Sequence, residues 1–113
     1  MVQLEGINPK MIANNTTPFY ATHPGEVLKD EVEYRGISQK ELASIIGMSY
    51  KALNDILNER RPITTESAML FEAALGISAE TLLKLQIEYN LSLARKSNTL
   101  IERLTSISKI ACL

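Results

Sequence analysis

The chain has 113 residues, which suffices for one modest hydrophobic core and not for two. Hydrophobic residues make up 45% of the sequence and charged residues 22%, so a chain disordered as a whole is excluded. The formal net charge is -1, so any basic surface must be local. The single cysteine, Cys112, fits a reducing compartment, and no apolar run approaches the ~20 residues of a membrane span. We therefore expect a cytoplasmic protein that does not enter a membrane.

The first predicted helix follows an irregular start. Residues 1–22 show no sustained period, and we expect them to form an arm that is disordered in the free protein. Pro24 suits the first turn of a helix, where its missing N–H costs nothing. Leu28 and Val32 lie on one apolar face of this helix, and Gly36 ends it as a C-cap residue.

The next two helices carry the strongest local signals. Ser38 and Glu41 have the spacing of a capping box, in which each side chain bonds to the backbone N–H of the other residue. Gly47 ends this helix, and Ser49 caps another that we predict to run through about Asn58. Two short helices joined by a tight turn with a glycine are the outline of a helix-turn-helix unit.

Two further helices are predicted after a loop that contains Arg60 and Arg61. Thr64 caps the fourth helix and Gly76 ends it, and Ser78 caps the fifth. The pattern becomes less regular over residues 90–98.

A last amphipathic helix is predicted from apolar residues at spacings of three and four, such as Leu100, Leu104 and Ile107. We expect an all-α fold, with five helices in residues 23–95 and the C-terminal amphipathic helix in residues 96–113. No strand-period segment of any length is present.

The third predicted helix has a polar face suited to reading bases. At 100° per residue its apolar side chains cluster on one side, so the polar ones point away from them. Lysine can donate to guanine, asparagine can pair with adenine, and a tyrosine ring can contact the thymine methyl group. An aspartate there either accepts from cytosine N4 or repels phosphate and so sets the orientation. The candidate base contacts are Tyr50, Lys51, Asn54 and Asp55.

Residues around this face can contact phosphates. Free N–H groups and side chains at helix N-termini bind phosphate, and loop arginines add donors. The candidate backbone contacts are Gln39, Lys40, Ser49, Asn58, Arg60 and Arg61. Each feature by itself fits the solvated surface of any small helical protein. Together, the caps, the glycine turn, the apolar triad and the basic loop favour DNA binding.

Segments of this unit resemble a known family. Residues 38–43, Gly47-Met48-Ser49 and residues 53–58 resemble the Xre/Cro-type helix-turn-helix that phage repressors share. The flanking residues 23–28 and 58–64 are similar to the HigA/VapI family of antitoxins. The similarity extends over about Thr22 to Arg95, and it departs at Glu59, where the family usually has glycine.

The resemblance implies a phage-repressor-like domain that forms a homodimer on an operator palindrome in its own promoter. It also implies a HigB-like toxin, a ribosome-dependent mRNA endonuclease that the chain neutralises. A helix-turn-helix regulator without a toxin is the alternative, and a protein-interaction module that has lost DNA binding is a third interpretation.

Neither an enzyme nor a cofactor is predicted. His23 is the only histidine, and no cysteine or acidic cluster lies at metal-ligand spacing from it. No Ser/His/Asp set and no glycine-rich phosphate loop is present. We expect His23 to act as a structural cap where the first helix begins.

The fifth predicted helix carries more apolar residues than one face can bury in so small a domain. Dimers of helix-turn-helix proteins bind half-sites one helical turn apart, so a dimer surface is needed. Our candidates are Leu82, Leu85, Tyr89 and Leu93. The alternative is that these residues complete the core of the monomer.

Overall fold

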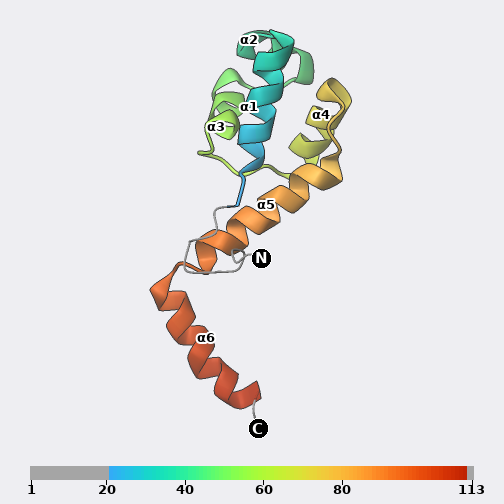
Figure 1. The fold of residues 1–113 in the computed structure, drawn as a ribbon. Coiled ribbons are helices and arrows are strands. Elements are labelled where there is room, and N and C mark those ends of the chain that lie inside the picture. Colours follow the sequence, from blue (N-terminus) through green and yellow to red (C-terminus); the bar gives the residue numbers. More distant parts are fainter. Residues whose placement is uncertain (1–20, 112–113) are drawn as a thin grey trace, which may run out of the picture.

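Six helices and no strands make up the part of the chain that the computed structural model describes, residues 21–111. The helices are α1 (Pro24–Arg35), α2 (Gln39–Ile46), α3 (Tyr50–Leu57), α4 (Thr65–Leu75), α5 (Ala79–Ala94) and α6 (Asn98–Ala111). Helices α1 to α4 gather around one end of α5, and α6 runs away from them (Figure 1). The all-α prediction is confirmed. The predicted N-terminal arm, residues 1–22, lies almost entirely outside the described residues.

Polar side chains begin the first five helices as predicted. The Ser38 hydroxyl accepts a hydrogen bond from the Glu41 N–H at 3.0 Å, and the Ser49 hydroxyl accepts from the Ala52 N–H at 3.1 Å. At Ser38 only this half of the predicted capping box forms, whereas a complete reciprocal capping box is present at Thr64, which pairs with Ser67. Each such cap stabilises its helix by about 1 kcal/mol.

His23 caps α1, as predicted. Its Nδ1 atom accepts a hydrogen bond from the Gly25 N–H at 2.9 Å, and its ring packs edge-on against Tyr89 of α5, with 4.7 Å between ring centroids. Burial lowers the pKa of His23 below its ordinary 6.5, although the carboxylate of Glu59 acts in the opposite direction. The neutral imidazole is therefore the form that the fold favours.

The irregular stretch predicted for residues 90–98 is shorter than expected. Helix α5 continues through Ala94, and the Gln86 amide donates to Asn90 Oδ1 one turn later at 2.9 Å. Only a short turn then separates α5 from α6. The last turns of α5 carry few buried residues, which accounts for the less regular pattern there.

The core joins α1 to α5. Its buried side chains come from every one of these helices and from the loop before α4: Leu28, Val32, Leu42, Ala43, Leu53, Ile56, Leu57, Ile63, Ala68, Phe71, Leu75 and Leu82. Burying one such large side chain stabilises the fold by about 1.5–3 kcal/mol. The Gln86 side chain also reaches the core and accepts from the Ile63 N–H at 2.8 Å, which fixes the loop that follows α3 against α5.

Helices α1 and α3 are in close contact at Gly25. A Cβ atom at this position would lie 2.0 Å from the Ile56 carbonyl oxygen, closer than any real contact. The missing side chain therefore lets the start of α1 pack against the backbone of α3. This contact fixes the orientation of α3, the helix predicted to read bases.

Candidate nucleic-acid interface

Helices α2 and α3 form the predicted helix-turn-helix unit. Gly47 ends α2 with a φ of +73°, a left-handed conformation that glycine adopts without strain, and the Met48 N–H donates to the Ala43 carbonyl at 3.0 Å. Ser49 then caps α3, so that the first turn of α3 is exposed. The exposed side chains there include Tyr50 and Lys51, two of the predicted base contacts.

Asn54 lies one turn further along α3, between two other predicted contact residues. Its Nδ2 atom donates to Gln39 Oε1 at 2.9 Å, and its Oδ1 atom accepts from Arg60 Nη2 at 2.9 Å. Both ends of the amide are therefore held, one by α2 and the other by the loop after α3. A side chain that is fixed in this way presents its polar edge with little loss of entropy.

Asp55 is the ionic centre of this surface. Its Oδ2 atom lies 3.3 Å from Lys51 Nζ and 3.5 Å from Arg61 Nη2, and its Oδ1 atom lies 3.1 Å from Arg60 Nη2. Its side chain is only 14% exposed, whereas those of all three cations are largely exposed. We use the name polar network for these linked residues: Gln39, Lys51, Asn54, Asp55, Arg60 and Arg61.

The pKa of Asp55 is lowered by this arrangement. Partial desolvation acts to raise it, but the hydrogen bonds and charges of Lys51 and Arg60 lower it by more. The carboxylate is therefore ionised at neutral pH, and the polar network carries three cations around one anion. Lys51 and Asp55 are paired at i,i+4 spacing within α3, whereas the two arginines reach Asp55 only through the fold of the loop.

Asn58 extends the polar network toward α1. Its Nδ2 atom donates to the Asn54 carbonyl at 2.9 Å, and its Oδ1 atom accepts from Lys29 Nζ at 3.4 Å. Lys29 was not among the predicted contact residues. No sequence signal could have identified it, because only the packing of α1 against α3 brings it to Asn58.

Besides Asn58, three predicted backbone or base contacts lie outside the polar network. Lys40 is exposed on α2, and Ser49 and Tyr50 are exposed where α3 begins. Among the described residues, none of the three bonds to a member of the polar network.

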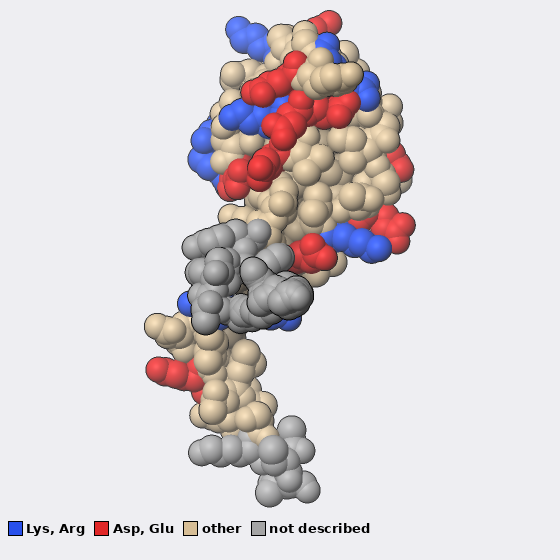
Figure 2. Space-filling model, in the orientation of Figure 1, with Lys and Arg blue, Asp and Glu red and all other residues tan. Residues whose placement is uncertain are grey.

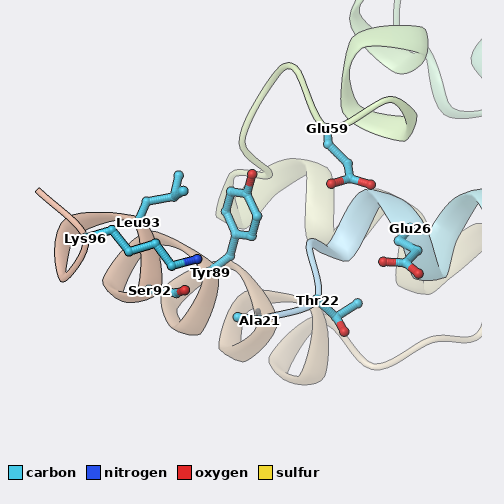
Figure 3. A pocket seen from close by; sticks show the side chains of 8 residues that line it. All are labelled: Ala21, Thr22, Glu26, Glu59, Tyr89, Ser92, Leu93 and Lys96. Atoms are coloured by element: carbon cyan, nitrogen blue, oxygen red, sulfur yellow. The ribbon is translucent and has the colours of Figure 1, made fainter. Parts of the chain in front are cut away.

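Glu59 stands at the turn that leads from α3 into the arginine loop. Its φ is +64°, and it is the only residue other than glycine with a positive φ in the described part of the chain. Its side chain lines a pocket of about 560 Å³ between the start of α1 and the last turns of α5, together with Glu26, Tyr89 and Lys96 (Figure 3). The departure from the family's usual glycine thus falls where the backbone itself favours glycine.

Charge is mixed on one face of the molecule. On the face seen in Figure 2, acidic and basic side chains are interspersed over the helical body and form no continuous basic patch. This matches the net charge of -1. Attraction to phosphate must therefore come from a local group of cations.

The four predicted dimer residues of α5 differ in their environments. Leu82 is fully buried in the core, so it cannot face a partner, and this part of the prediction is corrected. Its side chain completes the packing against α4. Leu85 and Tyr89 are half-buried, and Leu93 is 52% exposed. Two other α5 residues, Ile87 and Leu91, are also exposed apolar side chains.

Within residues 21–111, none of the helices has the length and apolar content needed to cross a bilayer. The same part of the chain contains no group of His, Cys, Asp and Glu side chains suited to a metal ion.

Comparison with known proteins identifies the family. The helix-turn-helix family matches residues 28–82. Virulence-associated protein I of Dichelobacter nodosus is 32% identical over 89 residues, which span 78% of this chain and 82% of that protein. An addiction module antidote protein of the HigA family from Coxiella burnetii superposes with a TM-score of 0.67 at 31% identity, over 75% of this chain and 95% of that one. The Pseudomonas aeruginosa antitoxin HigA, solved with the higBA promoter, superposes with a TM-score of 0.64 at 33% identity, over 74% and 88% of the two chains. The chain therefore belongs to the HigA/VapI family of antitoxins, which are helix-turn-helix regulators of the Xre type and not enzymes.

Proposed function

We propose that this chain is an antitoxin and transcriptional autorepressor that binds operator DNA through α2 and α3 and neutralises a HigB-like mRNA endonuclease toxin. The observation that carries the DNA-binding part is the polar network, which gathers most of the predicted contact residues on one surface of α3. The relative solved with promoter DNA supports DNA binding, because it superposes on 74% of this chain.

The first turns of α3 read base edges in the major groove. Tyr50 and Lys51 are exposed there, and Asn54 offers one donor and one acceptor from an amide that Gln39 and Arg60 hold in place. A bidentate pair between asparagine and adenine contributes about 1–3 kcal/mol of discrimination against the wrong base. Asp55 follows Asn54 on α3 and therefore lies close to the bases.

Phosphate contacts come from the residues that surround α3. Gln39 and Ser49 stand where α2 and α3 begin, at the positive ends of the helix dipoles. Lys40, Asn58, Arg60 and Arg61 add side-chain donors. Most of the affinity for any DNA sequence arises from such contacts, and it falls as salt concentration rises.

A homodimer places two α3 helices on the two half-sites of an operator. The exposed Leu93, together with Ile87 and Leu91, supplies apolar surface on α5 for this association. The exposed Leu104 and Ile107 of α6 supply a second apolar stripe. Burial of these side chains would be the driving force of dimer formation.

Titration of labelled promoter DNA tests the DNA-binding part. Wild-type protein is expected to bind the duplex upstream of its own gene more tightly than a scrambled duplex of equal length and composition. Asn54→Ala should cost about 1–3 kcal/mol on the operator and relax preference at one base position. Arg61→Ala should weaken binding to both duplexes alike and reduce the salt slope by about one. No binding by the wild type at low salt would show that the proposal is wrong.

Co-purification tests the toxin part. The chain is expressed together with the product of the neighbouring gene, and a small basic protein is expected to elute with it and to lose its mRNA cleavage activity. A neighbour that neither binds nor cleaves RNA would favour a regulator without a toxin.

A further inference from the structure

Asp55 is placed in the DNA-reading surface, yet its carboxylate is turned toward cations of its own chain. Its two oxygen atoms divide these between them, Oδ1 accepting from Arg60 and Oδ2 facing Lys51 and Arg61. The side chain is 14% exposed and lies beneath the three cationic groups. An aspartate that read cytosine would instead need a free oxygen directed at the groove.

Arg60 couples this ionic centre to the residue proposed to read adenine. Its Nη2 atom lies 3.1 Å from Asp55 Oδ1 and 2.9 Å from Asn54 Oδ1. Asn54 in turn donates to Gln39 at the start of α2. The position of Asp55 therefore sets the position of Arg60, and Arg60 sets the orientation of the Asn54 amide.

We propose that Asp55 is a specificity-determining and positioning residue, which holds Lys51, Arg60 and Arg61 as an internal counter-ion and so disfavours binding to non-cognate DNA. This inference rests on the proposed DNA-binding function. On random DNA, binding depends almost wholly on cations that neutralise phosphates, and here those cations must first leave Asp55. On the operator, Lys51 and Arg61 turn to the DNA while Asp55 still holds Arg60 against Asn54, because the base contact of Asn54 stabilises this ordered amide.

Two consequences follow for the free energies of binding. Without the carboxylate, Lys51, Arg60 and Arg61 become available to any phosphate backbone, so affinity for random DNA rises. The Asn54 amide also loses the orientation that Arg60 gives it, so affinity for the operator gains less or falls. The ratio of the two affinities, which is the measure of specificity, must therefore decrease.

The test compares Asp55→Asn with Asp30→Asn. Asp30 is the only other aspartate in the sequence and is exposed on α1, so its variant removes the same charge from a different place. Fluorescence anisotropy is used to titrate wild type and both variants with the operator duplex and the scrambled duplex over a range of salt. Circular dichroism is used to check that both variants keep the helical content of the wild type.

For Asp55→Asn we expect the affinity for the scrambled duplex to rise, its salt slope to steepen by about one per subunit, and the operator-to-scrambled ratio to fall by about tenfold. Asp30→Asn should leave the ratio as in the wild type. Equal ratios for the two variants would overturn the inference. So would loss of preference at a single base position with unchanged binding to scrambled DNA, because Asp55 would then read a base.

A double variant separates the internal counter-ion from simple repulsion of phosphate. If Asp55 acts through the cations, the gain on scrambled DNA should shrink when Asp55→Asn is combined with Arg61→Ala. A gain of equal size in both backgrounds would show that Asp55 only repels phosphate, and the inference would be wrong.

The free protein offers a measurement that needs no DNA. The side-chain amide of Asn54 gives a pair of ¹H–¹⁵N signals, and these should shift in Asp55→Asn as they do in Arg60→Ala, but not in Asp30→Asn. Unshifted signals in Asp55→Asn would contradict the positioning role. A wild type that does not distinguish operator from scrambled duplex would instead refute the proposed function. A discriminating wild type with an equally discriminating Asp55→Asn variant would refute only the role of Asp55.

Discussion

At the scale of single residues, Glu59 has an unusual backbone conformation and His23 an unusual degree of burial for a titratable side chain. Glu59 has a left-handed backbone, which costs a residue with a Cβ atom about 1–2 kcal/mol relative to a right-handed one. His23 is buried and accepts a hydrogen bond at Nδ1, so it is held in its neutral form. Both states are consequences of the contact between the loop after α3, the start of α1 and α5.

Replacing Glu59 by glycine should stabilise the protein. Glycine relieves the strain of the positive φ, and its greater freedom in the unfolded chain offsets part of the gain, so we expect a net increase of about 0.5–1 kcal/mol in the free energy of unfolding. Urea denaturation measures this change. Glu59→Gln is the control, since it removes the charge but keeps the strain, and it should not give the same increase. A less stable glycine variant would show that the Glu59 side chain makes a net favourable contribution.

Acidification should destabilise the protein through His23. The folded-state pKa lies below the unfolded value of 6.5, so the unfolded chain binds more protons in the interval between the two values. The contribution of His23 is therefore complete above about pH 6.5 and is lost as the pH falls from there through the folded-state pKa. Protonation also removes the acceptor that caps α1.

Thermal melting at a series of pH values measures this dependence. His23→Asn keeps a capping acceptor without a group that titrates in this range, and because the sequence has no other histidine, its melting temperature should change less between pH 7.5 and 5.5. Equal slopes for wild type and variant would mean that the pH dependence has another source.

At the scale of the helices, the packing of α1 against α3 decides the geometry of the interface. Gly25 permits this contact, and Gln86 fixes the loop that carries Arg60 and Arg61 by accepting from the Ile63 N–H. Arg35 adds a hydrogen bond to the Leu75 carbonyl at 2.7 Å, which joins the end of α1 to the end of α4. Helix α3 is therefore held by α1, and the loop that follows α3 is held by α5.

Gly25→Ala should destabilise the fold, although alanine is the better helix former by about 1 kcal/mol. The new Cβ atom would overlap the Ile56 carbonyl oxygen, so the two helices must separate. We expect a loss of about 2–3 kcal/mol, typical of overpacking in a well-packed interior, and weaker operator binding as α3 moves. Chemical denaturation measures the loss. Glu33→Ala, at an exposed position of the same helix, should leave the stability within about 0.5 kcal/mol.

At the scale of the whole molecule, the structure is more extended than its length requires. The radius of gyration is 18.5 Å, against about 13 Å for a compact domain of this size, and Figure 1 shows that α6 projects from the other helices. Exposed apolar side chains lie on α5 and along α6. A monomer would leave this surface in contact with water, which favours association with a second copy.

Leu93→Lys should shift the protein toward the monomer. The lysine would introduce a charge into the proposed α5 contact, and like charges would meet across a two-fold axis. Sedimentation velocity measures the change, and operator affinity should fall with it because the half-sites are no longer bound together. Met69→Lys is a matched control, since Met69 is 59% exposed on another helix, α4. A dimer that persists in Leu93→Lys would place the contact elsewhere.

The sequence by itself determined the local features of this protein. The helices, their caps at Ser38, Ser49 and Thr64, and the turn at Gly47 follow from signals only a few residues long. The polar face of α3 follows from the helical period alone, because side chains one turn apart share a face in any helix. For the same reason the candidate base contacts on α3 could be predicted from the sequence.

The tertiary structure decided which of these residues meet. Arg60 and Arg61 reach Asp55, and Lys29 reaches Asn58, only because the loop after α3 and the start of α1 pack around α3. Leu82 and Leu93 belong to one apolar pattern on α5, yet the first is in the core and the second is exposed, since α4 covers only the first turns of α5. Burial and ion pairing depend on segments that are distant in the chain, and helical period and capping do not. That physical difference separates what could be predicted here from what could not.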